Sequence, residues 1–99
     1  MVETYAGFDW DDGNWPKCGK HGVSRAEIEA VITGPVAVRP DVSHSRIETR
    51  FLAIGRTSDD RHVLVCFTIR QYHGSRYLRP ISARHMHQKE VVSFEKANS

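Results

Sequence analysis

The stretch KHGVSRAEI, residues 20–28, contains the strongest local structural signal of the chain. Ser24 and Glu27 have the spacing of a capping box, in which the serine oxygen accepts from the backbone N–H of residue 27 and the glutamate carboxylate accepts from the backbone N–H of residue 24. Val23 and Ile28 have the spacing of a hydrophobic staple, which sets the direction in which the chain enters a helix. These signals predict a helix that begins at about residue 24.

The apolar residues that follow predict which side of this helix is buried. Ile28, Val31 and Ile32 are three and four residues apart and therefore share one helical face. Gly34 and Pro35 predict the end of the helix near residue 33, because glycine tolerates a left-handed turn and proline does not continue a helix.

Basic residues supply a candidate site for an anion. Lys20 and His21 directly precede the helix, where the positive end of its dipole points. The net charge is +2, and nine arginines follow from residue 39, at positions 39, 46, 50, 56, 61, 70, 76, 79 and 84. Arginine suits bidentate contacts with phosphate. The charge pattern favours a nucleic-acid partner, and the alternative is a solvated surface of mixed charge.

Length and composition restrict the class of protein. The 99 residues are enough for one domain, and 39% hydrophobic and 26% charged residues are ordinary values for a soluble globular protein. No apolar run approaches the roughly 18 residues needed to cross a membrane, and the N-terminus lacks the pattern of a secretory signal. Cys18 and Cys66 do not form a disulfide framework, so we expect reduced thiols and a cytoplasmic protein.

Runs of apolar and alternating residues predict an α+β fold. The predicted strands cover residues 7–10, 47–54, 62–69 and 77–83. The 62–69 strand is the most apolar and is predicted to be central. Pro80 indicates an edge position or a bulge, and the proline-containing 36–42 segment has only weak extended character. A final helix is predicted over 85–96. The predicted sheet is an antiparallel three-strand meander plus a short N-terminal strand, and the helices are expected to pack on one face of it.

Strand alternation then places charged residues on one face of the sheet. The assumed register pairs residue 54 with 64 and residue 68 with 78. Arg70 then lies opposite both Glu48 and Arg76, with Arg84 further along the same face. Arginines that face each other attract an anion between them, and the alternative is a simple cross-strand ion pair between Glu48 and Arg70. The opposite face carries the predicted core, which is Val63, Val65, Phe67, Ile69, Ile81 and Ala83.

A set of short motifs resembles the BrnT family, the toxins of type II toxin–antitoxin systems. In order, the motifs are FDWD at 8–11, KHGVS at 20–24, ETR at 48–50, AIG at 53–55, FT at 67–68 with Arg70, and RPISAR at 79–84 with Glu90. The resemblance covers residues 7–95 and implies a RelE-like fold and an endoribonuclease that arrests translation and growth. It also implies neutralisation by a BrnA-type antitoxin, with operator DNA bound only through the toxin–antitoxin complex. The alternative is a non-catalytic RNA- or protein-binding module on the same fold.

For such a ribonuclease we predict a catalytic site without metal or cofactor. RNA cleavage then needs a base for the 2′-OH, charge stabilisation at phosphorus and an acid for the 5′ oxygen. Arg70 and Arg84 are predicted to clamp the phosphate, and Lys20 adds positive charge. His21 is a candidate acid or base, or else holds the loop by hydrogen bonds. Glu48 is a candidate base or orients an arginine.

Further residues are predicted to contact RNA outside the reaction centre. Tyr77 can stack on a base, as Tyr72 can, although Tyr77 also fits a core position. The predicted RNA-binding residues are Arg50, Arg76, Tyr77 and Arg79. A zinc site built from Cys18, His21, His85 and His87 is a weak alternative, because their spacing fits no standard ligand set.

Overall fold

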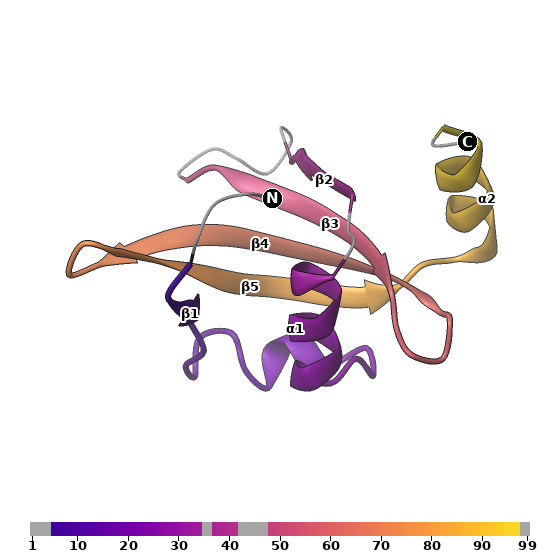
Figure 1. Cartoon of the computed structure of the whole chain (residues 1–99). Helices are drawn as coiled ribbons and strands as arrows, with labels where there is room; N and C mark the ends of the chain where they lie inside the picture. The colour runs from indigo at the N-terminus through magenta and orange to yellow at the C-terminus, as the bar shows by residue number, and fades with distance from the viewer. Residues whose placement is uncertain (1–4, 35–36, 42–47, 98–99) are drawn as a thin grey trace.

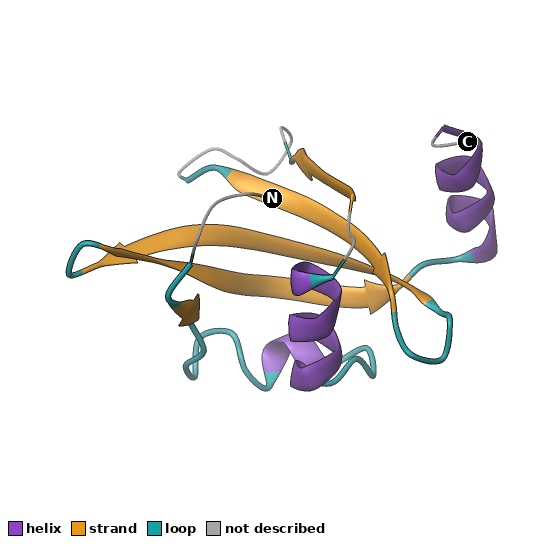
Figure 2. Ribbon diagram, viewed as in Figure 1, coloured by secondary structure: helices purple, strands orange, loops and turns teal. Residues whose placement is uncertain are grey.

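The structure is a computed structural model that describes residues 5–34, 37–41 and 48–97. Figure 1 shows an elongated sheet with one helix against it and a second helix at its end. The elements in chain order are β1 (Gly7–Phe8), η1 (Lys17–Gly19, a 3-10 helix), α1 (Arg25–Thr33), β2 (Ala37–Pro40), β3 (Arg50–Arg56), β4 (His62–Tyr72), β5 (Ser75–His85) and α2 (Gln88–Ala97). The α+β class is confirmed (Figure 2). The outer residues 36, 42 and 47 of two predicted extended segments lie outside the described residues.

The sheet has five strands in the order β1-β5-β4-β3-β2. β1 runs parallel to β5, and the other neighbouring strands are antiparallel, so the sheet is mixed. The predicted central place of β4 is confirmed. The predicted meander was incomplete, because residues 37–40 pair with β3 as an additional strand. Pro40 is tolerated there because β2 is an edge strand of the sheet.

Helix α1 forms where the capping signals predict it. Ser24 is the N-cap, its oxygen accepts from the Glu27 amide at 3.1 Å, and the Glu27 carboxylate accepts from the Ser24 amide at 3.0 Å. The backbone bond to Ser24 lowers the pKa of Glu27. Gly34 ends the helix in an extended conformation, with φ −87° and ψ −170°, so the predicted left-handed turn is wrong. The next described element, β2, begins at Ala37.

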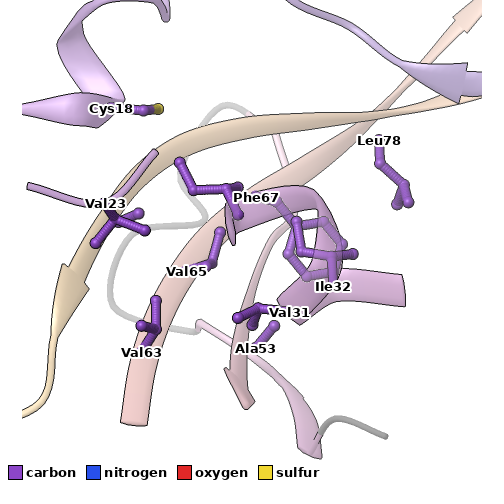
Figure 3. Packing of buried hydrophobic residues seen from close by; sticks show 11 residues of the cluster. Cys18, Val23, Val31, Ile32, Ala53, Val63, Val65, Phe67 and Leu78 are labelled. Carbon is purple, nitrogen blue, oxygen red and sulfur yellow. The ribbon is translucent and has the colours of Figure 1, made fainter. Parts of the chain in front are cut away.

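The apolar face of α1 closes a core on one side of the sheet (Figure 3). The predicted helix residues Ile28, Val31 and Ile32 are all buried. On the sheet, Val63, Val65, Phe67 and Ala83 face them as predicted, joined by Val23, Ala53, Leu78 and Cys18. Phe67 is 1% exposed and its ring stacks on Phe51 with 5.5 Å between centroids. This packing leaves the opposite face of the sheet available for polar side chains.

The registers assumed for the two hairpins have different outcomes. The first is confirmed, because Ile54 pairs with Leu64. The second is wrong by one residue, because Thr68 pairs with Arg79 rather than with residue 78. Cys66 pairs with Ser82, but the next residue, Phe67, pairs with Pro80. A bulge therefore leaves Ile81 of β5 without a partner in β4. The predicted irregularity at Pro80 is therefore confirmed as a bulge.

Helix α2 departs from the predicted arrangement. It begins at Gln88 rather than at residue 85, because His85 still pairs with Val63 at the end of β5. None of its residues is buried, and it stands beyond the end of the sheet in Figure 1. The expectation that both helices pack on one face therefore holds for α1 only. In the described part of the chain, no helix is long and apolar enough to span a membrane.

Candidate functional site

A cavity of about 280 Å³ lies on the sheet face opposite the core. Its floor is made by Leu52, Leu64 and Cys66 from the two central strands. Burial raises the pKa of the Cys66 thiol, so the floor is uncharged at neutral pH. The polar residues that line the cavity are Lys20, His21, Asp41, Arg50, Ser82 and Arg84. We call this the basic cavity.

The loop before α1 carries Lys20 and His21 to the rim of this cavity. Upstream, the Asn14 side chain donates to the carbonyls of Asp9, at 2.9 Å, and Pro80, at 2.8 Å, which ties the loop to β5 at its bulge. Both rim residues are exposed, and neither side chain forms a hydrogen bond or ion pair with another described residue. The predicted proximity of Lys20, His21 and Arg84 is therefore seen in the structure.

Arg84 is the cavity residue with the best-defined partner. Its Nη1 and Nη2 donate to the two carboxylate oxygens of Glu90 in α2, both at 2.8 Å. Glu90 also accepts from the backbone N–H of His87 at 2.9 Å. These contacts lower the pKa of Glu90 to about 2 and raise that of Arg84 above its already high value. The pair holds α2 against the end of β5 and fixes the Arg84 guanidinium at the cavity wall.

The Glu90 pKa predicts an acid-sensitive part of the stability. A carboxyl group whose pKa falls from 4.5 to about 2 on folding stabilises the folded state above pH 4.5, and this contribution is lost as the pH falls toward 2. We expect Glu90→Gln to reduce the loss of unfolding free energy over this interval. Urea unfolding at pH 2 to 6 measures it, with Glu95→Gln, an exposed residue of the same helix, as the control. An unchanged pH profile in Glu90→Gln would contradict the prediction.

Glu48 and Arg70 form a separate pair at the other end of the same face. Arg70 Nε and Nη2 donate to Glu48 at 3.0 and 3.2 Å, as the first hairpin register predicted. This bond raises the pKa of Arg70. Along β4, Arg70 is six residues from Leu64, the residue paired with Arg84, which corresponds to about 20 Å of strand. Two arginines so far apart do not close on one phosphate, so the predicted single clamp by Arg70 and Arg84 does not fit this geometry.

The slip in the second hairpin changes the neighbours of the other predicted RNA-binding residues. Arg70 lies opposite Tyr77, and Arg76 lies opposite Gln71 instead of opposite Arg70. The Arg76 guanidinium stands 5.6 Å from the ring centroid of Tyr5. Tyr77 packs against Tyr72, with ring centroids 5.6 Å apart, so an aromatic pair adjoins the Glu48–Arg70 pair.

Arg79 belongs to an ion-pair network with the N-terminal segment. Its guanidinium donates to Asp9 at 3.2 Å and to Asp11 at 2.9 and 3.1 Å, and its side chain is only 13% exposed. The Tyr72 hydroxyl donates to the same Asp9 at 2.9 Å, which raises the pKa of Tyr72. This geometry favours a structural role for Arg79, which joins β5 to the segment after β1.

Two residues in or beside the basic cavity were not predicted from the sequence as site residues. Asp41, 7% exposed, follows β2 and brings a carboxylate to the cavity. Glu90 was noted only as part of the resemblance, although it is the partner of Arg84. Neither had a local signal, because β2 was not predicted as a strand and the chain between Arg84 and Glu90 changes from strand to helix.

The cavity combines guanidinium, ammonium and imidazole donors above an apolar floor, which is typical of sites that bind the phosphate groups of nucleotides and nucleic acids. No group of three or more histidine, cysteine, aspartate or glutamate side chains suited to a metal ion occurs within residues 5–34, 37–41 and 48–97.

Comparison with protein families identifies the family of this chain. Residues 10–90 match the family model described as the ribonuclease toxin BrnT of type II toxin–antitoxin systems. The chain therefore belongs to the BrnT family. No match was found among curated proteins. Membership supports a ribonuclease toxin with RNA as substrate and an antitoxin as partner, and the matched region contains every lining residue of the basic cavity.

Proposed function

We propose that the protein is an endoribonuclease toxin that cleaves RNA without a metal ion, and that the basic cavity is its reaction centre. The observation that carries the proposal is that Lys20 and His21 line the same cavity as Arg84, although more than sixty residues of sequence separate them from it. A ribonuclease family membership gives these phosphate-binding groups a substrate. Glu48 and Arg70 are then assigned either to binding RNA away from the cleaved bond or to stabilising the sheet.

The proposed reaction is attack of the 2′-OH on the adjacent phosphorus. A base removes the 2′-OH proton, the P–O5′ bond breaks as the new P–O2′ bond forms, and an acid protonates the leaving 5′ oxygen. Asp41 is the proposed base and His21 the proposed acid, since both line the cavity. Arg84 and Lys20 stabilise the extra negative charge on the phosphate oxygens. The products are a 2′,3′-cyclic phosphate and a 5′-hydroxyl.

The RNA-binding surface extends along the sheet from this centre. Arg50 lines the cavity itself, and the aromatic pair Tyr72 and Tyr77 lies toward the tip of the β4–β5 hairpin. An exposed and a half-buried tyrosine beside an arginine suit unpaired bases and the backbone of single-stranded RNA. A strand that crosses the face from the basic cavity to Arg70 would contact both clusters.

The proposed partner is a BrnA-type antitoxin with a ribbon-helix-helix domain, and operator DNA is bound only through that complex. We also infer a RelE-like, single-domain, cytoplasmic toxin whose release arrests translation and growth. These finer assignments rest on the resemblance of the ordered motifs and on the family membership.

The test is incubation of the purified protein with single-stranded RNA, with and without EDTA. We expect cleavage that survives EDTA and yields fragments with 2′,3′-cyclic phosphate and 5′-hydroxyl ends. Loss of activity in EDTA would overturn the metal-independent mechanism. One observation favours the second candidate, a non-catalytic RNA-binding module: Glu90 already occupies two donors of Arg84. Tight RNA binding without cleavage would support that candidate.

A further inference from the structure

We propose that a hollow next to the basic cavity is a binding subsite for one nucleobase, the base that neighbours the bound phosphate. The hollow has a volume of about 420 Å³ and is lined by Trp15, Pro16, Gly19, Lys20, Gly22, Val23 and Ser24. It lies on the loop that carries the cavity's rim residues. The inference deepens the proposed function and rests on it for the identity of the ligand.

Lys20 connects the two spaces, because it lines both the basic cavity and the hollow. A phosphate bound in the cavity near the Lys20 ammonium would therefore have its own nucleoside within reach of the hollow. Nucleic-acid proteins commonly join a cationic phosphate contact to an aromatic surface in this way. Because Lys20 borders both spaces, a base joined to the bound phosphate is a more economical occupant than a separate ligand.

The composition of the hollow suits an uncharged planar ring. Apart from Lys20, its lining residues carry no charged side chain. Trp15 offers an indole ring and Pro16 an apolar ring. Gly22 has a φ of +87°, and a β-carbon built there would meet no atom within 4 Å, so this wall is open. A purine or pyrimidine therefore fits the lining better than an anion or a charged peptide does.

Trp15 is already held in place for stacking. Its ring meets Trp10 edge to face, with 5.5 Å between centroids and 83° between planes. The Arg25 guanidinium lies 5.8 Å from its centroid. A β-carbon on Gly19 would stand only 2.8 Å from Trp15 Cη2, so Gly19 allows the loop to close on the ring. A ring fixed from several sides loses little freedom when a base binds.

The test uses the fluorescence of single-tryptophan variants. Trp10→Phe leaves Trp15 as the remaining tryptophan, and Trp15→Phe leaves Trp10. We expect adenosine 3′- or 5′-monophosphate to quench Trp10→Phe in a saturable way, and ribose 5-phosphate, which lacks the base, to leave it unchanged. In Trp15→Phe neither compound should quench. Equal effects of the nucleotides and ribose 5-phosphate, or no quenching at all, would overturn the subsite.

Two further variants separate binding from folding. Trp15→Leu should weaken nucleotide binding roughly 5- to 150-fold, the range for loss of one base–aromatic stack. Gly22→Asn keeps every core side chain, since asparagine tolerates a positive φ, and adds a side chain at the open wall. It should weaken nucleotide binding while thermal unfolding stays cooperative. Unchanged nucleotide affinity in a folded Gly22→Asn would count against the subsite.

The outcomes also distinguish this inference from the proposed reaction. Nucleotide quenching of Trp15 without RNA cleavage would keep the subsite and reject the catalytic proposal. Cleavage that depends on Arg84 but has the same KM in wild type and Trp15→Leu would keep the reaction and reject the subsite.

Discussion

Arg84→Ala is expected to lower kcat for RNA cleavage by about 100- to 1000-fold, the usual effect of removing one preorganised donor that stabilises developing charge. Arg84 is fixed at the wall of the basic cavity by its two bonds to Glu90, both at 2.8 Å. A donor held before substrate arrives needs no reorganisation during the reaction. Initial rates on a single-stranded RNA, measured with saturating substrate, test this expectation.

Two controls make the Arg84 result specific. Arg56→Ala removes an exposed arginine of β3 that pairs with Asp60 at 2.9 Å and does not line the cavity, and it should leave kcat unchanged. The double variant Arg84→Ala with Glu90→Gln removes the carboxylate left without its partner. It should be as slow as the single variant if charge stabilisation is lost. Full activity in a folded Arg84→Ala protein would remove this arginine from the mechanism.

The fold could be predicted where the deciding contacts are local in sequence. The capping box at Ser24 and Glu27 depends on three residues of spacing, and helix α1 formed as predicted. The register assumed for the first hairpin, which has a short turn, is also confirmed, and it brings Glu48 to Arg70. In the helix a fixed three-residue spacing brings the capping partners together, and in the sheet alternation places Glu48 and Arg70 on one face once the turn register is set.

The second hairpin shows why strand alternation alone was insufficient. The predicted register was one residue out, which moved Arg76 from its expected place opposite Arg70. The bulge near Pro80 then added a residue to β5, so that Arg84, paired with Leu64, still reached the predicted face. The placement of Arg84 was therefore right although the register used to derive it was wrong. Pro80 signalled an irregularity, but its effect on register depends on tertiary pairing.

The different roles of the arginines could not be predicted from the sequence. Arg79 and Arg84 are both arginines of β5, yet Arg79 is enclosed by Asp9 and Asp11 whereas Arg84 reaches a cavity. That difference depends on where the N-terminal segment and α2 place their carboxylates, and neither position follows from strand or helix periodicity. The loop with Lys20 and His21 was located because a strong helix signal follows it.

Phe67→Ala is expected to lower the free energy of unfolding by about 3–5 kcal/mol, the range for truncating a buried phenylalanine. Phe67 is 1% exposed, stacks on Phe51 with 5.5 Å between centroids, and lies opposite Pro80 at the bulge. Small domains have only about 5–15 kcal/mol of stability, so the loss would remove a large share of it. Urea unfolding at neutral pH measures the change as a lower midpoint with an unchanged slope.

Val92→Ala is the matched control, because Val92 is 47% exposed on α2 and its truncation should change stability by less than about 0.5 kcal/mol. A Phe67→Ala loss below about 1 kcal/mol would mean that the ring does not anchor the sheet. The effect also reaches the candidate site. Cys66, the neighbour of Phe67 on β4, points to the other face and forms the cavity floor. Since one strand carries both the core ring and the cavity floor, we expect Phe67→Leu, which keeps most of the volume, to preserve more activity than Phe67→Ala.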